Sequence, residues 1–317
     1  MAERKVVAVI GASGFLGRHI VENFLSHGWY VVGFSRRKVE FVGGEYSWQY
    51  LDIEDPRSVE SVDFRRFSAV ILNSGLVASN NPARFWAVNG VGTFNVVSHL
   101  ESTGYEGKFL YISSLAIYGP GEHSHDEEEF NPVSEYGRSK LFAERLIRRS
   151  KLKWNILRPP VIFGEYDVGL KDIIRLISLG VGLRWNSPKV ISMVYAGNVA
   201  EAVRCVIESS VDATTFTIKD ADFTWEDFSV YVSSALGKKI KFWITLNDFI
   251  IKSIFYPGIF LGCILGVSSF FNRDKLKELT ADKWVYKSTN VEITGYSRVF
   301  SLEESISRSL RNWYLQK

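Results

Sequence analysis

The sequence predicts an α/β protein with a doubly wound parallel sheet and a smaller lobe toward the C-terminus. Through residues 1–164, short β-branched runs alternate with longer amphipathic stretches, which favours parallel strands joined by right-handed helical crossovers. The expected strands are apolar along their whole length, as in sheets covered by helices on both faces. After Gly164 the alternation of strand-like and helix-like segments becomes less regular, which indicates a second region with a different architecture.

The expected elements of the first region follow from length and periodicity. Strands are predicted at residues 6–10, 30–34, 69–72, 109–112 and 155–157. Helices are predicted between them at residues 16–26, 82–102 and 133–150.

The second region has fewer clear signals. Helices are predicted at residues 171–179, 198–209, 225–236 and 302–314, and short strands at 191–195 and 215–218. We therefore divide the chain into a first domain, residues 1–164, and a smaller lobe, residues 165–317. Segment 190–210, with the strand near 193 and its helix, is expected to rejoin the first domain.

Composition excludes several classes of protein. The chain has 317 residues, of which 46% are hydrophobic, and this fraction is too high for a disordered chain. The net charge of +3 gives no indication that the protein binds nucleic acid. Two cysteines cannot form a disulfide framework, and no Cys/His cluster has metal-ligand spacing, so we predict no metal. The N-terminal residues lead directly into an apolar strand without a signal peptide, which favours a cytoplasmic protein.

A glycine-rich turn follows the first expected strand. Gly11, Gly14 and Gly17 have the spacing G-x-x-G-x-x-G and lead into a helix. Such glycines permit a tight turn, close approach of the main chain to a pyrophosphate, and close packing of helix on strand. The helix N-terminus then offers N–H groups to the phosphates. The turn predicts a Rossmann-type dinucleotide-binding domain, with Ser13, Phe15 and Leu16 also in the cofactor site.

The end of the second strand bears on the choice of cofactor. This position usually holds an acidic residue that binds the ribose hydroxyls. Here it is Ser35, followed by Arg36 and Arg37. Without a carboxylate to repel a 2′-phosphate, and with an arginine to bind one, NADP is favoured and NAD is the alternative. The arginines could equally be exposed loop charges.

Two further pairs are expected at the cofactor. Asp52 and Ile53 close the third strand and could bracket the adenine, although Asp52 could instead cap the helix that starts near Pro56. Ser74 and Gly75 end the fourth strand, at the sheet edge where ligands bind in such folds.

A Ser, Tyr and Lys set carries the predicted chemistry. Ser114 follows the fifth strand, and Tyr136 and Lys140 lie four residues apart, hence on one helix face. A tyrosine acting as acid and base near neutral pH needs its pKa lowered from about 10. A neighbouring ammonium can lower it by favouring the phenolate. Ser114 would hydrogen-bond the reacting oxygen.

Together with the glycine turn, these residues resemble the extended short-chain dehydrogenases/reductases, the group of NAD(P)-dependent epimerases and dehydratases. Further matching segments are residues 89–93, 113–119, 136–144, 157–164 and 194–200. The resemblance implies that Tyr136 is the acid/base, that Lys140 lowers its pKa and holds the nicotinamide ribose, and that Ser114 binds the substrate oxygen. It also implies that Asn89 supports the site and that Pro159 and Val161 line the nicotinamide. A homodimer packing helices 82–102 and 133–150 is usual in such families.

The sequence also departs from part of that group. Sugar 4,6-dehydratases carry an Asp-Glu pair after the Ser or Thr, where this chain has Leu115 and Ala116. We therefore expect a ketoreductase or epimerase acting on a nucleotide sugar by hydride transfer at a carbinol or carbonyl carbon. One alternative is a 3β-hydroxysteroid- or isoprenoid-type dehydrogenase at a membrane surface. Another is a dinucleotide-sensing regulator without catalysis.

One segment concentrates the apolar residues of the second region. From Ser253 to Asn272 there are twenty residues without a charge, with Gly258, Gly262 and Gly266 at every fourth position. The segment could be a helix pair broken at Pro257, buried or facing a dimer partner. It could instead contact or enter a membrane through residues 253–271, which would make the protein membrane-associated, or form an apolar lid over the substrate.

Overall fold

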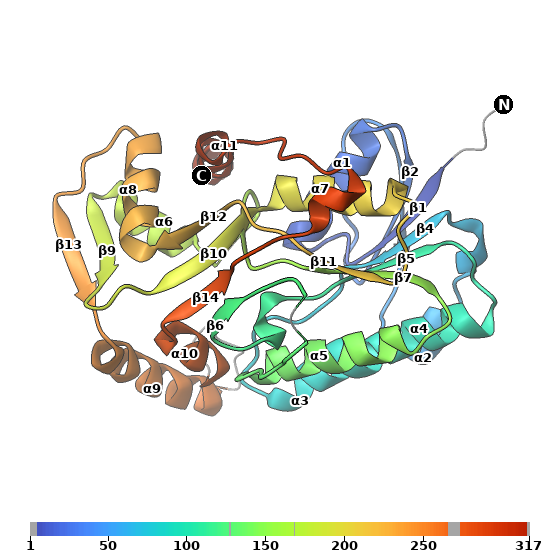
Figure 1. Ribbon diagram of the computed structural model, residues 1–317, viewed down its shortest axis with the longest axis horizontal. Helices are drawn as coiled ribbons and strands as arrows, with labels where there is room; N and C mark the ends of the chain where they lie inside the picture. The colour runs from blue at the N-terminus through green and yellow to red at the C-terminus, as the bar shows by residue number, and fades with distance from the viewer. Residues whose placement is uncertain (1–4, 127, 168, 266–272, 316–317) are drawn as a thin grey trace.

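The computed structural model describes residues 5–126, 128–167, 169–265 and 273–315. Its largest element is a parallel sheet of seven strands in the order β11-β7-β5-β4-β1-β2-β3 (Figure 1). The strands are β1 (Val6–Ile10), β2 (Tyr30–Ser35), β3 (Glu45–Tyr50), β4 (Ala69–Leu72), β5 (Lys108–Ile112), β7 (Lys153–Arg158) and β11 (Thr214–Thr217). This sheet confirms the predicted α/β fold.

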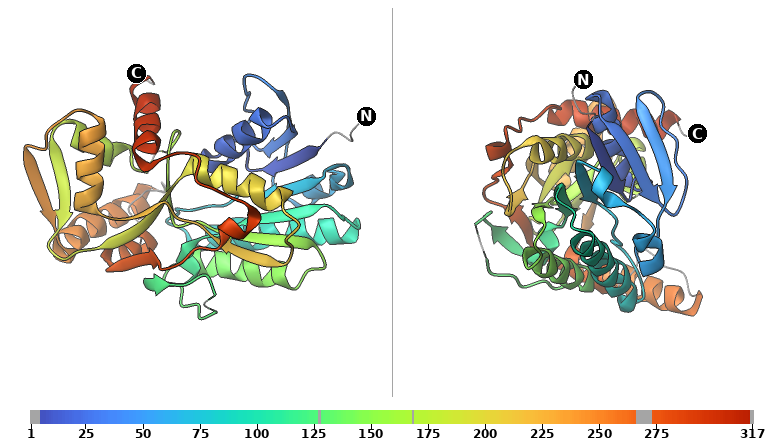
Figure 2. Two further views of the ribbon diagram at one scale, coloured as in Figure 1. Left: turned by 45° about the horizontal axis from the view of Figure 1, so that its top comes forward. Right: turned by 90° about the vertical axis from the view of Figure 1, so that its right-hand side faces the viewer.

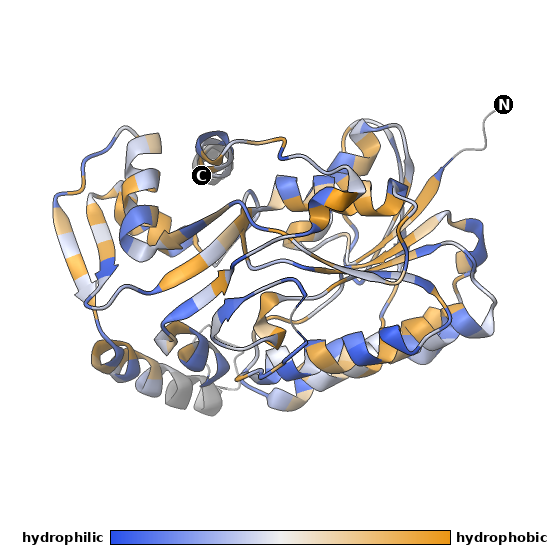
Figure 3. Ribbon diagram, in the orientation of Figure 1, coloured by the Kyte–Doolittle hydropathy of each residue, from blue (hydrophilic) through white to orange (hydrophobic). Residues whose placement is uncertain are grey.

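Helices cover both faces of the sheet, as the end-on view in Figure 2 shows. On one face lie α1 (Phe15–Ser26) and α7 (Ala196–Glu208), and on the other α2 (Pro56–Glu60), α4 (Gly92–Ser102) and α5 (Glu135–Arg148). The two apolar cores meet at the strands, whose residues alternate between them: Val7 and Val9 face the first, Ala8 and Ile10 the second. The orange strands inside bluer helices in Figure 3 reflect this burial.

The expected helix at 82–102 forms as three consecutive pieces. These are α3 (Pro82–Phe85), a π-helical turn (Trp86–Val91) and α4. The strand expected to close at Asp52 and Ile53 is β3, which already ends at Tyr50. Its sequence, EYSWQY, is only partly buried, because it forms the outer edge of the sheet and lacks the apolar run of the inner strands.

A second sheet combines strands from both regions. In it β12 (Ala221–Thr224), β10 (Val190–Tyr195), β14 (Lys283–Tyr286) and β6 (Gly121–His123) lie side by side, and β8 (Val161–Phe163) also pairs with β10. A two-stranded sheet, β9 (Val181–Trp185) with β13 (Phe242–Leu246), lies at the far left of Figure 1. Helices α6 (Lys171–Ser178), α8 (Trp225–Ala235) and α11 (Leu302–Leu315) complete the second region.

Segment 190–210 is shared between the two sheets. The strand expected to rejoin the first sheet, β10, belongs to the second one, whereas its helix α7 packs on α1 and the following strand β11 pairs with β7. The reason lies at Pro159 and Pro160, which separate β7 from β8 and lead the chain into the second sheet. There β8 offers β10 a parallel neighbour.

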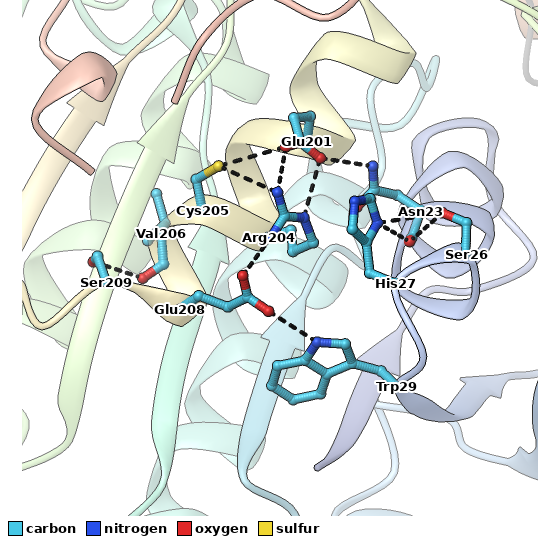
Figure 4. Close-up of polar contacts among 10 residues, drawn as sticks. All are labelled: Asn23, Ser26, His27, Trp29, Glu201, Arg204, Cys205, Val206, Glu208 and Ser209. Atoms are coloured by element: carbon cyan, nitrogen blue, oxygen red, sulfur yellow. Dashed lines mark hydrogen bonds and ion pairs between the residues drawn. The ribbon is translucent and has the colours of Figure 1, made fainter. Parts of the chain in front are cut away.

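A polar network joins α7 to α1 (Figure 4). Glu201 accepts a hydrogen bond from Asn23 Nδ2 at 3.0 Å and pairs with Arg204. Arg204 also pairs with Glu208, which accepts a bond from Trp29 Nε1 at 3.1 Å. The network thus anchors the C-terminal end of α1, and the segment that leads into β2, to α7.

The apolar segment near the C-terminus forms α9 (Asp248–Leu265), followed by α10 (Arg273–Thr280). The expected break at Pro257 does not occur, because α9 continues through this residue. Pro257 and Ser253, whose carbonyl loses its intrahelical partner, are both exposed, so water can replace the missing bond. Residues 266–272, with Gly266, lie outside the described residues. Of the helices within the described ranges, none has the length and apolar character to cross a bilayer.

Candidate functional site

A cavity of about 990 Å³ opens at the carboxyl ends of β1, β2, β4, β5 and β7. Its lining brings together most of the residues predicted from the sequence. These are Gly11, Ser13, Gly14, Phe15, Leu16, Ser35, Arg36, Arg37, Asp52, Ile53, Ser74, Gly75, Ser114, Tyr136, Lys140 and Pro159. Gly17, Asn89 and Val161 are not part of the lining, whereas Pro160 and Ile162, on either side of Val161, are.

Backbone geometry and close neighbouring atoms both require glycine in this turn. Gly11 has a φ of 92°, and a Cβ there would lie 2.8 Å from the backbone nitrogen of Ser74. A Cβ on Gly17 would lie 2.1 Å from the carbonyl oxygen of Gly11, so α1 can approach β1 only with glycine there. Helix α1 begins after Gly14 without a side-chain cap, which leaves N–H groups at its N-terminus that could bind an anion.

The end of β2 is more crowded than the sequence suggests. Ser35 is buried and its hydroxyl donates to the Arg37 carbonyl at 2.7 Å. The Arg36 guanidinium is 59% exposed and lies 3.5 Å from Glu54. Glu54 in turn receives two hydrogen bonds from Arg84, at 2.6 and 2.9 Å. Because Arg84 already neutralises the Glu54 carboxylate, that carboxylate compensates little of the positive charge on Arg36. The Arg36 guanidinium can therefore still bind an anionic ligand.

The alternative of Asp52 as a helix cap is wrong. Asp55 caps α2, accepting from the backbone N–H of Arg57 at 3.0 Å. Asp52 instead accepts from the N–H of Glu54 at 3.1 Å and lines the cavity beside Ile53. Arg18, Lys38 and Glu54 also line this end of the cavity and were not identified from the sequence. No spacing rule marks them, because they come from three different segments.

Ser114 and Tyr136 meet at the inner end of the cavity. The Ser114 hydroxyl accepts from the N–H of Ala116 at 3.1 Å and lies near the Tyr136 phenol. Burial raises the pKa of Tyr136 to about 12, the neighbouring Ser114 hydroxyl opposes this rise, and the charge of Glu278 adds to it. By itself the folded chain therefore keeps this phenol protonated, and a nearby cation must lower its pKa before it can act as a base.

Lys140 supplies a cation one helical turn further along α5. Its side chain is buried, and Nζ donates to the Ile112 carbonyl at 2.8 Å and lies 4.7 Å from the ring centroid of Tyr111. Burial lowers the pKa of Lys140 to about 7, against a smaller opposing effect of Glu144. An anionic or hydroxyl-rich ligand in the cavity would therefore favour the protonated lysine.

Asn89 lies outside the cavity lining and connects two segments of the site by hydrogen bonds. Its side chain is buried in the π-helical turn and makes reciprocal bonds with the backbone of Leu76, at 2.8 and 3.0 Å. It also donates to the Ser139 hydroxyl at 2.9 Å, which donates to the carbonyl of Tyr136. Asn89 thus links the loop after β4 to the helix that carries Tyr136.

Comparison with known proteins bears on this arrangement of glycine turn, Ser, Tyr and Lys. The family model described as "NAD dependent epimerase/dehydratase family" matches residues 7–218. The chain belongs to this family. A nicotinamide dinucleotide is accordingly its cofactor, and the cavity, the uncapped α1 and the buried Lys140 fit such a group.

Several relatives match nearly the whole chain. N-acetyl-α-D-glucosaminyl-diphospho-ditrans,octacis-undecaprenol 4-epimerase of Escherichia coli O157:H7 is 25% identical over 96% of this chain and 94% of its own length. Sterol-4-α-carboxylate 3-dehydrogenase (decarboxylating) of Saccharomyces cerevisiae is 24% identical over 98% of both chains. The crystal structure of UDP-glucose 4-epimerase of Thermotoga maritima with UDP-glucose has a TM-score of 0.75 and 20% identity, covering 98% of this chain and 99% of that one.

Asp274 is a residue of the site that the sequence did not indicate. It comes from α10, and its carboxylate accepts from the backbone N–H groups of Glu135 and Tyr136, at 2.6 and 3.2 Å. Ser134 accepts from Gly137 N at 3.1 Å in the same turn. A carboxylate at a helix N-terminus is stabilised by the helix dipole. Asp274 therefore acts as a positioning residue for Tyr136.

We predict that the stability contributed by Lys140 depends on pH. Its pKa is about 7 in the folded chain, against 10.5 for a lysine surrounded by water, so the unfolded chain binds more protons between these values. Folding stability should therefore rise with pH from about 7 toward 10, by up to about 1.4 kcal/mol per pH unit. Urea unfolding of the cofactor-free protein at pH 6 and pH 9 measures this.

Lys140→Met removes the titrating group. The unfolding free energy of the unaltered protein, relative to this variant, should increase from pH 6 to pH 9. Lys153→Met, at an exposed lysine, should retain the pH dependence of the unaltered protein. A constant difference between Lys140→Met and the unaltered protein at both pH values would contradict the prediction.

We also predict that Asp274→Ala lowers turnover more than binding. The variant leaves two N–H groups at the start of α5 without their acceptor, at a cost of about 1–2 kcal/mol. Turnover number should fall several-fold while the Michaelis constant for the cofactor changes little, because the glycine turn is untouched. Asp274→Asn, which keeps an accepting oxygen, should restore most of the loss. Equal losses in both variants, or a loss confined to cofactor binding, would argue against a positioning role.

Proposed function

We propose that the protein is an NAD(P)-dependent ketoreductase or epimerase that acts at a carbinol or carbonyl carbon of a sugar carried on a diphosphate. One observation carries this proposal. Ser114, Tyr136 and Lys140 converge at the inner end of a cavity whose other end is the glycine turn. A regulator that only senses a dinucleotide would need the turn but not the three converging side chains.

The proposed chemistry assigns each side chain a task. The bound nicotinamide supplies the hydride acceptor or donor. Tyr136 moves the proton of the reacting hydroxyl, Ser114 donates a hydrogen bond to the same oxygen, and Lys140 stabilises the phenolate form of Tyr136. Burial disfavours the phenolate form of Tyr136 and the ammonium form of Lys140. For this reason the pKa of Tyr136 is raised and the pKa of Lys140 is lowered before ligands bind.

A nucleotide sugar is the substrate class that we propose first. The Thermotoga maritima enzyme was solved with UDP-glucose, and it shares the fold along the whole chain. Leu115 and Ala116 stand where a 4,6-dehydratase has its acidic pair, and their hydrocarbon side chains cannot act as a second acid or base. This favours a reductase or an epimerase over a dehydratase.

A lipid or lipid-linked substrate is the second candidate. It is supported by the exposed apolar helix α9 and by two relatives that match nearly the whole chain. One of them acts on an undecaprenol-linked sugar, and the other is a sterol dehydrogenase. Residues 253–258 do not line the main cavity, which gives no support to the apolar lid weighed for this segment.

A homodimer and a preference for NADP are also part of the proposal. Large apolar side chains are exposed on the two helices expected to form a dimer: Trp86, Val91, Phe94 and Phe142. Their burial against a second copy would remove them from water. The preference for NADP is supported by the exposed guanidinium of Arg36 beside the neutralised Glu54. The proposed location is the cytoplasm.

Tyr136→Phe is expected to lower the turnover number by at least about a hundredfold, because general acid–base catalysis contributes that much or more. Affinity for the cofactor, measured by fluorescence quenching, should be preserved. Steady-state assays on a panel of nucleotide sugars, including UDP-glucose, provide the measurement. Tyr231→Phe, which changes an exposed tyrosine far from the cavity, should behave like the unaltered protein. Turnover that survives in Tyr136→Phe would refute the mechanism.

Arg36→Ala is expected to raise the Michaelis constant for NADPH by roughly tenfold and to leave that for NADH nearly unchanged, since only the 2′-phosphate loses a charge-assisted bond. Arg57→Ala serves as the control, because Arg57 is an exposed arginine outside the cavity lining. Equal or better use of NADH by the unaltered protein, with no effect of Arg36→Ala, would overturn the NADP preference.

A further inference from the structure

Helix α9 has one face packed on the protein and one that the described residues leave open. Ile251 and Phe255, four residues apart, are buried against Leu276 of α10. The opposite side bears Phe249, Ile250, Ile254 and Tyr256, all exposed, and Phe249 retains 79% of its accessible surface. These four residues are called the α9 face. Four large apolar side chains on about two helical turns form an apolar patch of the kind that marks an interaction site.

The exposed charges beside the α9 face are basic. Lys252 lies on α9 itself, and Arg273 and Lys277 lie on α10, all exposed. Two carboxylates nearby are engaged within the protein: Asp248 pairs at 3.0 Å with the buried Lys189, and Asp274 binds the N-terminus of α5. A third, Asp282, is exposed and lies 3.7 Å from the same lysine. The positive charge offered to a partner is therefore that of Lys252 and Arg273, which border the apolar segment.

The sequence of this segment has the same character. No charge occurs from Ser253 to Asn272, and the run is bounded by Lys252 and Arg273. An apolar helix face with basic residues at its border is suited to the interface of a bilayer, where the apolar side chains enter the acyl region and the cations meet the lipid phosphates. Lysine can extend its charged group to that level along the stem of its side chain.

We propose that the α9 face docks on the surface of a bilayer containing anionic phospholipid. The α9 face would bury its apolar side chains among the lipids, and Lys252 and Arg273 would contact the headgroup phosphates. A protein partner would need an apolar groove and an acidic rim to match both features, whereas the surface of an anionic bilayer supplies apolar and negatively charged groups together. The helix lies in the surface and does not cross the bilayer.

The position of α9 relates this docking to the catalytic residues. Figure 1 shows α9 at the lower left of the molecule, with α10 between it and the start of α5. Helix α10 contacts the start of α5 through Asp274, and it contacts the segment just before α5 through Lys277, whose Nζ donates to the Val133 carbonyl at 3.3 Å. Docking would therefore bring the Tyr136 end of the cavity toward the bilayer. The idea that this docking serves an amphiphilic substrate rests on the proposed function, whereas the proposal of docking itself does not.

Vesicle sedimentation tests the proposal with the full chain, free of detergent. The protein should sediment with vesicles of phosphatidylcholine and phosphatidylglycerol at a 7:3 ratio, and far less with phosphatidylcholine alone. Raising the salt concentration should weaken binding to the anionic vesicles, because it screens the lysine and arginine contacts. Phe249→Ser/Ile254→Ser should reduce the partition coefficient by about tenfold or more, since two large apolar side chains are lost.

Matched variants separate the α9 face from general surface effects. Leu179→Ser/Ile293→Ser removes two equally exposed apolar residues elsewhere and should bind vesicles normally. Lys252→Glu/Arg273→Glu should abolish the preference for anionic vesicles, whereas Lys151→Glu/Lys153→Glu, at exposed lysines outside this segment, should retain most of it. Far-ultraviolet circular dichroism and cofactor binding verify that each variant is folded.

Two outcomes would overturn the proposal. One is equal recovery of the unaltered protein in the supernatant with and without anionic vesicles. The other is a dimer that becomes a monomer in Phe249→Ser/Ile254→Ser by light scattering, with no vesicle binding by either form, since a second copy would then cover the α9 face. Neither outcome depends on turnover. Failure of the docking is thus distinguishable from failure of the proposed function, which the Tyr136→Phe assay decides separately.

Discussion

The buried ammonium of Lys140 is the constraint around which the site is built. A lysine removed from water must find hydrogen-bond acceptors or lose its charge. Here the Ile112 carbonyl at the end of β5 and the ring of Tyr111 receive it, which holds α5 against the carboxyl end of the sheet. A Cβ on Gly75 would lie 3.1 Å from Nζ, so the loop after β4 also has to adapt to this one group.

Tyr136 depends on the same helix, and the helix depends on segments remote in sequence. Asn89 ties it to the loop after β4, and Asp274 caps it from α10. The second region therefore takes part in building the site. Its Asp274 supplies an acceptor for the first turn of α5, and α10 joins that turn to the apolar helix α9. Changes in α9 or α10 can thus reach Tyr136 without entering the cavity.

The parts of the site that could be predicted depend on local structure. A single turn places Gly11, Gly14 and Gly17, and a single helix face places Tyr136 and Lys140. Asp274 could not be predicted, because it lies 138 positions from Tyr136 and only the packing of α10 on α5 brings them together. The continuity of α9 through Pro257 was missed for a related reason. The cost of proline in a helix depends on whether water reaches the freed carbonyl, and only the fold decides which side is exposed.

The sequence by itself determined the alternation of strands and helices, the phosphate-binding turn and the Ser, Tyr and Lys set, because each follows from periodicity or from spacing within one element. The tertiary structure alone decided that β10 belongs to a second sheet, that Arg84 neutralises Glu54 beside Arg36, and that α9 leaves one apolar face open. These features depend on which distant segments become neighbours. Pairing of that kind is set by the packing of the whole chain and has no signature within any short stretch of it.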